Sequence, residues 1–464
     1  MFDADKSFET KSSLRKTIAL TLERARNTQK TTNAFISICD DLALARAEEL
    51  EKTTINKRLF GLPIAVKDNI NVLGTKTTCG SKLLASYISS YTSTAVSRLL
   101  EDGAIIIGKT NMDEFAMGSS SESSYFGPVR NPRDLSKVAG GSSGGSAATV
   151  ATGTVSVALG SDTGGSIRQP ASFCGVVGFK PSYGAISRFG LVAHGSSLDQ
   201  IGPIANSAKL CAQVFESMVG LDVRDQSTIE IAKTTPKKSF SGLRVAFVAN
   251  SWVDACDDRI KNMMRELRTK FSKLGATIIE NIDPGFKYAL PCYYIISSAE
   301  ASSNLSRFDG IRYGNESIAS LRERKVFAPF RSSGFGAEVK RRIMLGTYVL
   351  SEGYAEQYYR KAISARQKII SQTQVMFDSA DVFITPVSAS PAFSIGEKTA
   401  DPVAMYQSDT FTTYANLAKI PAIALPFRDD KSEQSPIGFQ IHAPYRADRA
   451  LLSVAEHYEA QHDR

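Results

Sequence analysis

The sequence predicts an α/β fold, because short β-rich runs alternate with amphipathic helical segments. Two such runs cover residues 64–66 and 104–107. Between them, 93–103 (STAVSRLLEDG) has apolar residues at helical spacing and ends on a glycine. Hydrophobic residues make up 42% of the chain and charged residues 22%, which is typical of a folded globular protein that buries a sizeable core.

The N-terminal part of the chain, residues 1–52, is predicted to be a helical segment whose two stretches flank the polar 27–33 (NTQKTTN). Helices and strands then alternate up to a C-terminal helix. The predicted strands lie within 176–181, 242–250, 380–388, 419–426 and 436–444, and predicted helices lie within 206–220, 256–280 and 337–375. At 464 residues the chain is long enough for two or three domains, or for one large α/β domain with insertions.

Cysteine spacing and hydropathy exclude several classes of protein. The six cysteines are far apart and form no CxxC pair, which argues against a disulfide framework or a zinc site and favours packing roles. No run of 18 apolar residues is present, and no secretory signal begins the chain. The net charge of +8 is dispersed, so we interpret it as ordinary surface charge, with the lysine-rich 233–240 as a solvated loop.

Two glycine-rich serine clusters fall within residues 140–170 (GGSSGGSAATVATGTVSVALGSDTGGSIRQP). A phosphate-binding P-loop is disfavoured, because no lysine follows these glycines as GxxxxGK[ST] requires. The nucleophile elbow GxSxG is matched around Ser142 and again around Ser143, but an elbow needs a preceding strand and a histidine base. No convincing strand precedes the cluster, and the only histidines are His194, His442, His457 and His462.

Lysine can replace histidine as the base if burial lowers its pKa by several units from about 10.4 and leaves a neutral amine. Lys67 is the candidate, since it ends an apolar run (PIAVK) where burying a charged side chain is unfavourable. The same position also suits a lysine that reaches solvent from the end of a strand. The local sequence leaves both interpretations open.

The joint spacing of Lys67, Ser142 and Ser166, which lie 75 and 24 residues apart, resembles the amidase signature family. The long motif from 140 to 184 carries most of this resemblance. The family has an α/β fold with a large mixed β-sheet covered by helices on both faces. The resemblance implies one amidase domain over 1–464, with a signature core at 60–205 and an insertion at 222–370 that contributes to the substrate pocket.

By motif position, the resemblance implies that Ser166 is the nucleophile, Ser142 a bridging serine at a cis peptide bond, and Lys67 the distal base. A proton would pass from Ser166 through Ser142 to neutral Lys67. The supporting hydrogen-bonding residues are predicted to be Ser143 and Ser161.

The backbone N–H groups of TGGS in the second cluster are predicted to form an oxyanion hole, because glycine lets a substrate carbonyl approach the backbone without a Cβ clash. The predicted donors are Thr163, Gly164 and Gly165, together with the N–H of Ser166.

Three further segments are similar to one branch of the family, the glutamine-hydrolysing components of tRNA-dependent amidotransferases. They are 187–203, 297–314 and 339–354. A free amino acid carries an α-carboxylate and an α-ammonium, so its pocket needs one cation and one anion. The positions that hold these groups in this branch correspond to Arg342 and Asp409, with Tyr293 as a third contact. Local alternatives stay open, with Arg342 a surface helix charge and Asp409 a helix N-cap.

This branch implies that the chain hydrolyses glutamine and releases ammonia for converting Glu-tRNA(Gln) to Gln-tRNA(Gln). It also implies a partner B subunit, a kinase and transamidase that binds the tRNA and uses ATP and Mg²⁺, and a third small subunit. No cofactor or metal is expected in this chain, which shows no ATP motif and no RRM or KH signature. One alternative is a stand-alone amidase of small amides. Another is a catalytically silent assembly subunit, which the intact serine and lysine set disfavours.

The compartment is predicted to be the mitochondrial matrix, with the bacterial cytoplasm as the alternative. This prediction rests on the basic charge and on a chain that is shorter at both ends than bacterial members of the branch. The first residues, MFDADKSFETK, include acidic residues, which is not typical of a transit peptide.

Overall fold

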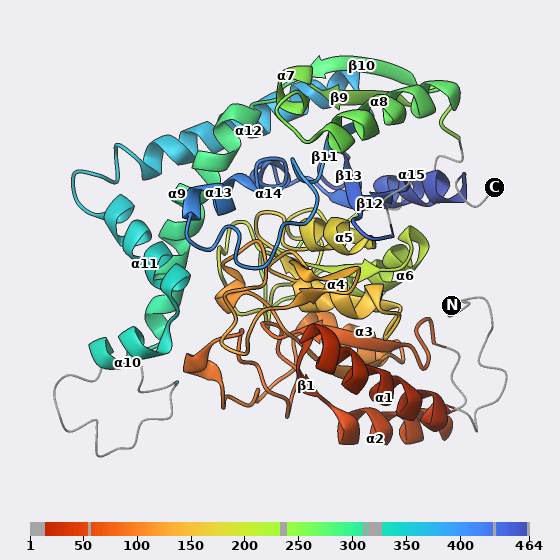
Figure 1. The fold of residues 1–464 in the computed structure, drawn as a ribbon, viewed down its shortest axis with the longest axis vertical. Helices are drawn as coiled ribbons and strands as arrows, with labels where there is room; N and C mark the ends of the chain where they lie inside the picture. The colour runs from red at the N-terminus through yellow and green to blue at the C-terminus, as the bar shows by residue number, and fades with distance from the viewer. Residues whose placement is uncertain are drawn as a thin grey trace.

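The fold is built on one large mixed β-sheet (Figure 1). The computed structural model describes residues 14–53, 57–232, 239–309, 313, 327–429 and 433–461. Within these residues the main sheet has eleven strands in the order β1-β3-β2-β6-β8-β7-β12-β13-β11-β9-β10. They are β1 (Phe35–Ile38), β2 (Pro63–Lys67), β3 (Ile105–Thr110), β6 (Val157–Asp162), β7 (Val177–Lys180), β8 (Gln200–Ala205), β9 (Arg244–Val248), β10 (Thr277–Ile282), β11 (Val382–Pro386), β12 (Ala422–Phe427) and β13 (Ile437–His442). A separate ribbon pairs β4 (Arg130–Asn131) with β5 (Asp134–Val138).

Helices pack around this sheet, and a group of them extends along one side of the molecule. They are α1 (Leu14–Thr32), α2 (Asp40–Glu51), α3 (Thr94–Glu101), α4 (Gly144–Ala151), α5 (Arg168–Cys174), α6 (Ala208–Met218), α7 (Asn250–Val253), α8 (Asp258–Lys273), α9 (Phe286–Asn304), α10 (Phe327–Gly334), α11 (Ala337–Leu350), α12 (Tyr359–Ser379), α13 (Pro402–Gln407), α14 (Thr413–Leu417) and α15 (Asp448–Ala460). Figure 1 shows α1 and α2 at one end and α9, α10 and α11 together along one side. Of the helices described, none has the length and apolar character needed to cross a membrane.

Alternate residues of β2 enter different hydrophobic cores. Ile64 and Val66 belong to a cluster that includes residues of α3 and α6, whereas Ala65 belongs to a second cluster with residues of α1 and α4. Successive side chains of a strand point to opposite faces of a sheet, so helices cover both faces here. Burial on both faces explains why β2 is a continuous apolar run in the sequence.

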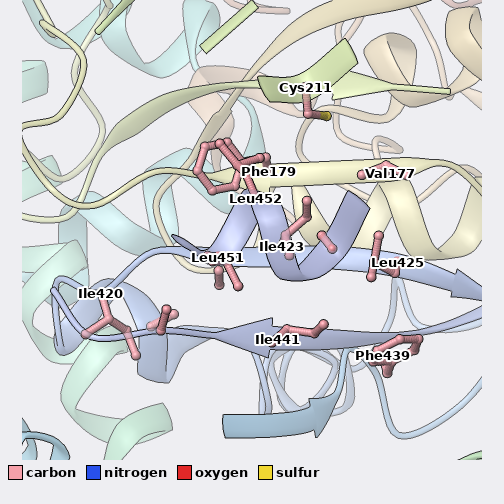
Figure 2. Close-up of a cluster of buried hydrophobic side chains, with 14 of the residues drawn as sticks. Val177, Phe179, Cys211, Ile420, Ile423, Leu425, Phe439, Ile441, Leu451 and Leu452 are labelled. Carbon is pink, nitrogen blue, oxygen red and sulfur yellow. The ribbon is translucent and has the colours of Figure 1, made fainter. Parts of the chain in front are cut away.

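The larger core continues between the strands β7, β12 and β13 and the helix α15 (Figure 2). Phe179 of β7, Ile423 of β12 and Ile441 of β13 are buried, and Leu451 and Leu452 of α15 belong to the same cluster. This packing fixes β12 and, with it, the position of α14, which immediately precedes that strand.

Most of the predicted elements are confirmed. The runs at 64–66 and 104–107 lie in β2 and β3, and 93–103 contains α3, whose first turn is capped by the Ser93 hydroxyl. Gly103 has a φ of 92°, which is the left-handed conformation expected of a glycine beyond a helix end. The five strands predicted downstream are β7, β9, β11, β12 and β13. All six cysteines are free thiols, and Cys39 is the one that is only partly buried.

Three local predictions differ from the structure. The segment 1–52, expected to be helical, contains β1, which pairs antiparallel with β3 at the edge of the sheet. Helix α1 continues through most of the polar 27–33, because its threonines are satisfied locally: Thr32 Oγ1 donates to the Thr28 carbonyl at 2.7 Å. The helix expected over 337–375 is two helices, α11 and α12, separated by a turn in which Gly353 has a φ of 81°.

A fourth difference concerns the first glycine cluster, because the strand β5 does precede it, although none is expected from the sequence. β5 is a short ribbon strand with three exposed residues, so it gives no apolar run. Residues 1–13 and most of the predicted loop at 233–240 lie outside the described residues.

Candidate active site

The candidate site lies where several strands end or begin at one edge of the sheet. β2 runs parallel to β6, so their last residues, Lys67 and Asp162, reach the same edge. β8 is antiparallel to β6 and begins at Gln200, opposite Asp162, which brings the loop 194–199 to that edge as well. The sheet therefore gathers segments that are far apart in the sequence.

Lys67 is fully buried and contacts both serine clusters. Its Nζ donates to Ser142 Oγ at 2.8 Å, to Ser161 Oγ at 3.0 Å and to the Ser161 carbonyl at 3.2 Å. Burial lowers the pKa of Lys67 to about 7, and nearby aspartates only partly oppose that shift. The alternative in which Lys67 reaches solvent is therefore wrong, and a substantial fraction of this amine is neutral near pH 7.

The two glycine-rich clusters lie in direct contact. The Gly141–Ser142 peptide bond is cis, as the family resemblance implies. The Ser143 N–H donates to the Ser166 carbonyl at 3.1 Å, and the Gly141 N–H donates to Gln169 Oε1 at 2.9 Å. The structure thus places Ser142 and Ser166 in adjoining segments. The contact recorded for Ser166 runs through its backbone, so proton exchange between the two hydroxyls stays a prediction.

Ser166 lies in the loop between β6 and α5, and Asp162 organises that loop. The Asp162 carboxylate accepts from the N–H groups of Gly165 at 2.8 Å and Ile167 at 3.2 Å, and it pairs with the guanidinium of Arg168 at 3.0 Å. Burial alone would raise the pKa of Asp162, but the Arg168 charge prevails and lowers it to about 2. The carboxylate therefore stays ionised and holds the loop in shape.

One of the predicted oxyanion donors is bound within the loop itself. The Gly165 N–H is already bound to the carboxylate at the end of β6, which removes it from the groups available to a substrate in this structure. In the described part of the chain, the N–H groups of Gly164 and Ser166 have no recorded acceptor. Thr163 is held through its hydroxyl, which donates to Asp199 Oδ1 at 2.6 Å.

Arg342 is buried in α11, so the surface-charge alternative is wrong. Its Nε donates to Glu338 Oε1, one turn earlier, at 2.7 Å. Its Cζ lies 4.4 Å from the ring centroid of Tyr294 and 4.7 Å from that of Tyr406. Nη1 has no hydrogen-bond partner among the described residues. A buried guanidinium with a vacant donor is suited to bind a carboxylate.

Asp409 is buried in the turn before α14. Its two carboxylate oxygens accept from Ser119 Oγ at 2.8 and 2.9 Å, and one of them also accepts from Tyr294 Oη at 2.8 Å. Burial raises the pKa of Asp409 to about 6, although both hydroxyl donors oppose that shift. The N-cap alternative is wrong, since Thr412 occupies that position of α14.

Tyr293 lies on α9 against the nucleophile loop. A Cβ on Gly164 would lie 2.5 Å from the Tyr293 ring carbon Cζ, so only glycine fits at this contact. Thr412 holds the same residue from another side, because its Oγ1 donates to the Gly164 carbonyl at 2.6 Å. The structure therefore brings Tyr293 to the second serine cluster.

Several residues of the site were missed by sequence reasoning. Asp162 and Arg168 stand on either side of the nucleophile motif (DTGGSIR), and that pair of opposite charges was an available signal. Tyr294 and Tyr406, whose rings stack with centroids 4.1 Å apart, carry no local signal. Among the described residues, no group of three or more His, Cys, Asp or Glu is arranged to hold a metal ion.

The histidines do not form a catalytic triad within the described part of the chain. His194 and His442 are buried, and burial lowers the pKa of His194 to about 3 and that of His442 well below its ordinary value. His457 packs on the ring of Phe240, with centroids 4.9 Å apart. His462 lies outside the described residues.

Comparison with known proteins identifies the family of this chain. The family model described as Amidase matches residues 16–452. The chain belongs to the amidase family. This amidase is 47% identical over 447 residues to the glutamyl-tRNA(Gln) amidotransferase A subunit of Thermoanaerobacter pseudethanolicus, and the match covers 94% of this chain and 91% of that protein.

Solved structures agree with the fold of this amidase. The crystal structure of the glutamyl-tRNA(Gln) amidotransferase A subunit of Thermotoga maritima matches with a TM-score of 0.80 at 38% identity, covering 99% of this chain and 96% of that one. A bacterial aryl acylamidase of the amidase signature family matches with a TM-score of 0.82 at 22% identity, over 97% and 94% of the two chains, which is a likeness of fold. The predicted large mixed sheet flanked by helices is confirmed.

Proposed function

We propose that this amidase is the glutaminase subunit of a glutamyl-tRNA(Gln) amidotransferase. It hydrolyses glutamine and supplies the ammonia that converts Glu-tRNA(Gln) to Gln-tRNA(Gln). The observation that carries the proposal is the buried contact of 2.8 Å between Lys67 Nζ and Ser142 Oγ, in a segment that adjoins Ser166. The names of the relatives at 47% and 38% identity support the choice of reaction.

In the proposed mechanism, Ser166 Oγ bonds to the side-chain amide carbon of glutamine, and its proton moves through Ser142 to the neutral amine of Lys67. The carbon–nitrogen bond then breaks, and the relay returns the proton to the leaving nitrogen. Ammonia departs, and a glutamyl ester remains on Ser166. Water attacks this ester through the same relay and releases glutamate.

The oxyanion of each tetrahedral intermediate is stabilised by backbone N–H groups of the loop that follows β6. Gly164 and Ser166 have N–H groups without a recorded acceptor in the described part of the chain, and Thr163 adjoins them. Each such donor typically contributes about 10²- to 10³-fold to the rate. Gly165 has its N–H on Asp162, so we assign it to holding the loop rather than the oxyanion.

Recognition of the amino-acid end of glutamine is assigned to Arg342 and Asp409. The vacant Nη1 of Arg342 binds the α-carboxylate, and the carboxylate of Asp409 binds the α-ammonium. Tyr293, against Gly164, supplies a third contact near the reacting amide. A small uncharged amide has no charged group for the vacant Nη1 of Arg342 or the carboxylate of Asp409 to bind, which disfavours a stand-alone hydrolase of such amides.

The complete reaction needs partners in this proposal. A B subunit binds the tRNA, phosphorylates its glutamyl group with ATP and Mg²⁺, and receives the ammonia, and a third small subunit completes the complex. The mitochondrial matrix stays a prediction for the compartment, from the basic charge of the chain. The relatives named above are bacterial proteins, and they favour the bacterial cytoplasm.

The test replaces Ser166 by alanine in the assembled complex and compares two nitrogen donors. With glutamine, amidation of Glu-tRNA(Gln) falls at least about 10³-fold, because the nucleophile is lost. With ammonia supplied directly, amidation continues, because the partner chemistry does not need Ser166. Equal loss with both donors contradicts the proposal.

A matched control is Ser172→Ala, which removes another buried hydroxyl further along the chain, in α5. Its complex retains amidation with both donors if the effect at Ser166 is chemical. If Ser172→Ala lost glutamine-supported amidation to the same extent, the effect would belong to the stability of α5, and the nucleophile would be sought elsewhere.

A further inference from the structure

Tyr294 connects the two charged residues assigned to substrate recognition. Its hydroxyl donates to Asp409 Oδ2 at 2.8 Å, and the Arg342 guanidinium carbon lies 4.4 Å from its ring centroid. Tyr294 is itself buried. One rigid side chain on α9 therefore contacts an anion in the turn before α14 and a cation on α11.

Tyr406 lies beside Tyr294 and contacts the same cation. Its ring stacks on Tyr294 with centroids 4.1 Å apart and lies 4.7 Å from the guanidinium carbon of Arg342. Its hydroxyl donates to Glu338 Oε1 at 2.9 Å, the oxygen that also accepts from Arg342 Nε. The rings of both tyrosines thus contact the guanidinium. Of the two tyrosines, Tyr294 is the one whose hydroxyl donates to Asp409.

Two opposite charges buried near each other, as Arg342 and Asp409 are, attract each other strongly, because the local dielectric is low. If Arg342 and Asp409 met directly, each would satisfy the other, and neither would be available to a ligand. No ion pair between them is recorded among the described residues, and Arg342 keeps Nη1 vacant. The Tyr294 side chain contacts both and supplies each with a neutral partner.

We propose that Tyr294 is a positioning residue that keeps Arg342 and Asp409 apart at the spacing of the two charged groups of an α-amino acid. The proposal rests on the assignment of glutamine as substrate. Tyr294 touches no reacting atom, and it acts through the two charges. The ring supports the cation by a cation–π contact, and the hydroxyl supports the anion by a charge-assisted hydrogen bond.

The hydroxyl of Tyr294 also affects the proton equilibrium of Asp409. Groups that face this carboxylate are Ser119 and Tyr294 as donors, Arg342 and Lys398 as cations, and Asp113 as an anion. Burial raises the pKa of Asp409 to about 6, and the Tyr294 hydroxyl opposes that shift. Without the hydroxyl, Asp409 takes up a proton at a higher pH, and the pocket loses its anion.

The experiment compares Tyr294→Phe with Tyr406→Phe in the assembled complex. Both variants keep the ring and lose one hydroxyl. For Tyr294→Phe we expect the KM for glutamine to rise about tenfold with kcat nearly unchanged, since one hydrogen bond to a charged group is lost. The acidic limb of kcat/KM moves to higher pH. Tyr406→Phe leaves that limb in place, because its hydroxyl does not contact Asp409.

Two further measurements separate failure of this proposal from failure of the glutaminase assignment. Hydrolysis of butyramide, which has neither charged group, is expected to be equal in Tyr294→Phe and in the unsubstituted complex. If the unsubstituted complex does not hydrolyse glutamine, the glutaminase assignment itself is contradicted, and the positioning proposal falls with it. If it does, and Tyr294→Phe leaves both KM and the acidic limb unchanged, or impairs glutamine and butyramide equally, the positioning role is overturned.

Discussion

Lys67 Nζ and Ser142 Oγ lie 2.8 Å apart, although 75 residues separate them in the sequence. The contact follows from the sheet: β2 ends at Lys67 beside the end of β6, and the first serine cluster is fastened to the loop after β6 by the hydrogen bond from Ser143 N–H to the Ser166 carbonyl. A buried amine thus meets a hydroxyl at a place fixed by strand register, where burial lowers the pKa of Lys67 to about 7.

The first prediction concerns the pH dependence of glutamine hydrolysis. A lysine accepts a proton only as the neutral amine, so kcat rises as the pH increases through about 7 and then levels off. Lys67→Arg stays charged at every accessible pH and loses about 10²- to 10⁴-fold in kcat. Initial rates between pH 5.5 and 9 measure both effects.

Lys180 provides the control for that profile. It is another buried lysine whose pKa burial lowers to about 7, but its Nζ donates to the Pro181 carbonyl at 2.7 Å rather than to a serine. The rising limb persists in Lys180→Met if Lys67 is the base. A limb that disappeared in Lys180→Met, or a flat profile in the unsubstituted protein, would exclude Lys67 from this role.

The second prediction concerns Arg342 and the α-carboxylate. Arg342→Ala is expected to raise the KM for glutamine about 100-fold, the loss of a charge-assisted hydrogen bond in a buried site, while butyramide hydrolysis is nearly unchanged. Arg342→Lys recovers only part of this loss, because an ammonium lacks the planar fork. The matched control is Arg341→Ala, the preceding residue, whose side chain is 45% exposed. If Arg342→Ala impaired glutamine and butyramide equally, the assignment of Arg342 to the α-carboxylate would be contradicted.

The third prediction concerns the ion pair beneath the nucleophile loop. Asp162→Asn leaves the buried Arg168 charge unpaired and is expected to lower the free energy of unfolding by about 3–5 kcal/mol, as measured by denaturant titration. Glutamine hydrolysis falls as well, because the loop around Ser166 loses its organising carboxylate. The control, Glu280→Gln, breaks a far more exposed pair with Arg268 and costs only about 0–1 kcal/mol. Similar costs for the two variants would contradict the structural account.

Local sequence predicted β2, β3, β7, β9, β11, β12 and β13, because burial leaves apolar runs such as that of β2. It gave no strand at β6 or β8, both of which contain glycine, or at β10. It missed β1, whose four residues lie between two helices and pair only at the edge of the sheet. The polar linker predicted at 27–33 lies mostly within α1, because threonines that bond within the helix look like a polar linker in the sequence. Edge pairing and local side-chain bonds are not visible in hydrophobic periodicity.

In the site, too, residues in local motifs were predictable and contacts between distant elements were not. Spacing in the motif, with the family resemblance, named Lys67, Ser142 and Ser166, and the structure gathers them at one sheet edge. The loop-holding role of Gly165 was harder to foresee, because it depends on the hydrogen bond from its N–H to the Asp162 carboxylate. Tyr294 was missed because its partners lie on separate elements, one of them 115 residues away, and no local pattern reports such a contact.

The groups proposed to cleave the amide and the groups proposed to recognise the amino-acid end of glutamine come from different elements of the fold. Lysine and serines occupy the sheet edge, whereas Arg342 and Tyr294 come from α11 and α9, which lie together along one side (Figure 1). A change of side chain on those helices alters which amide is accepted without moving a strand. New substrates can therefore evolve through helix substitutions while the reaction chemistry is inherited intact.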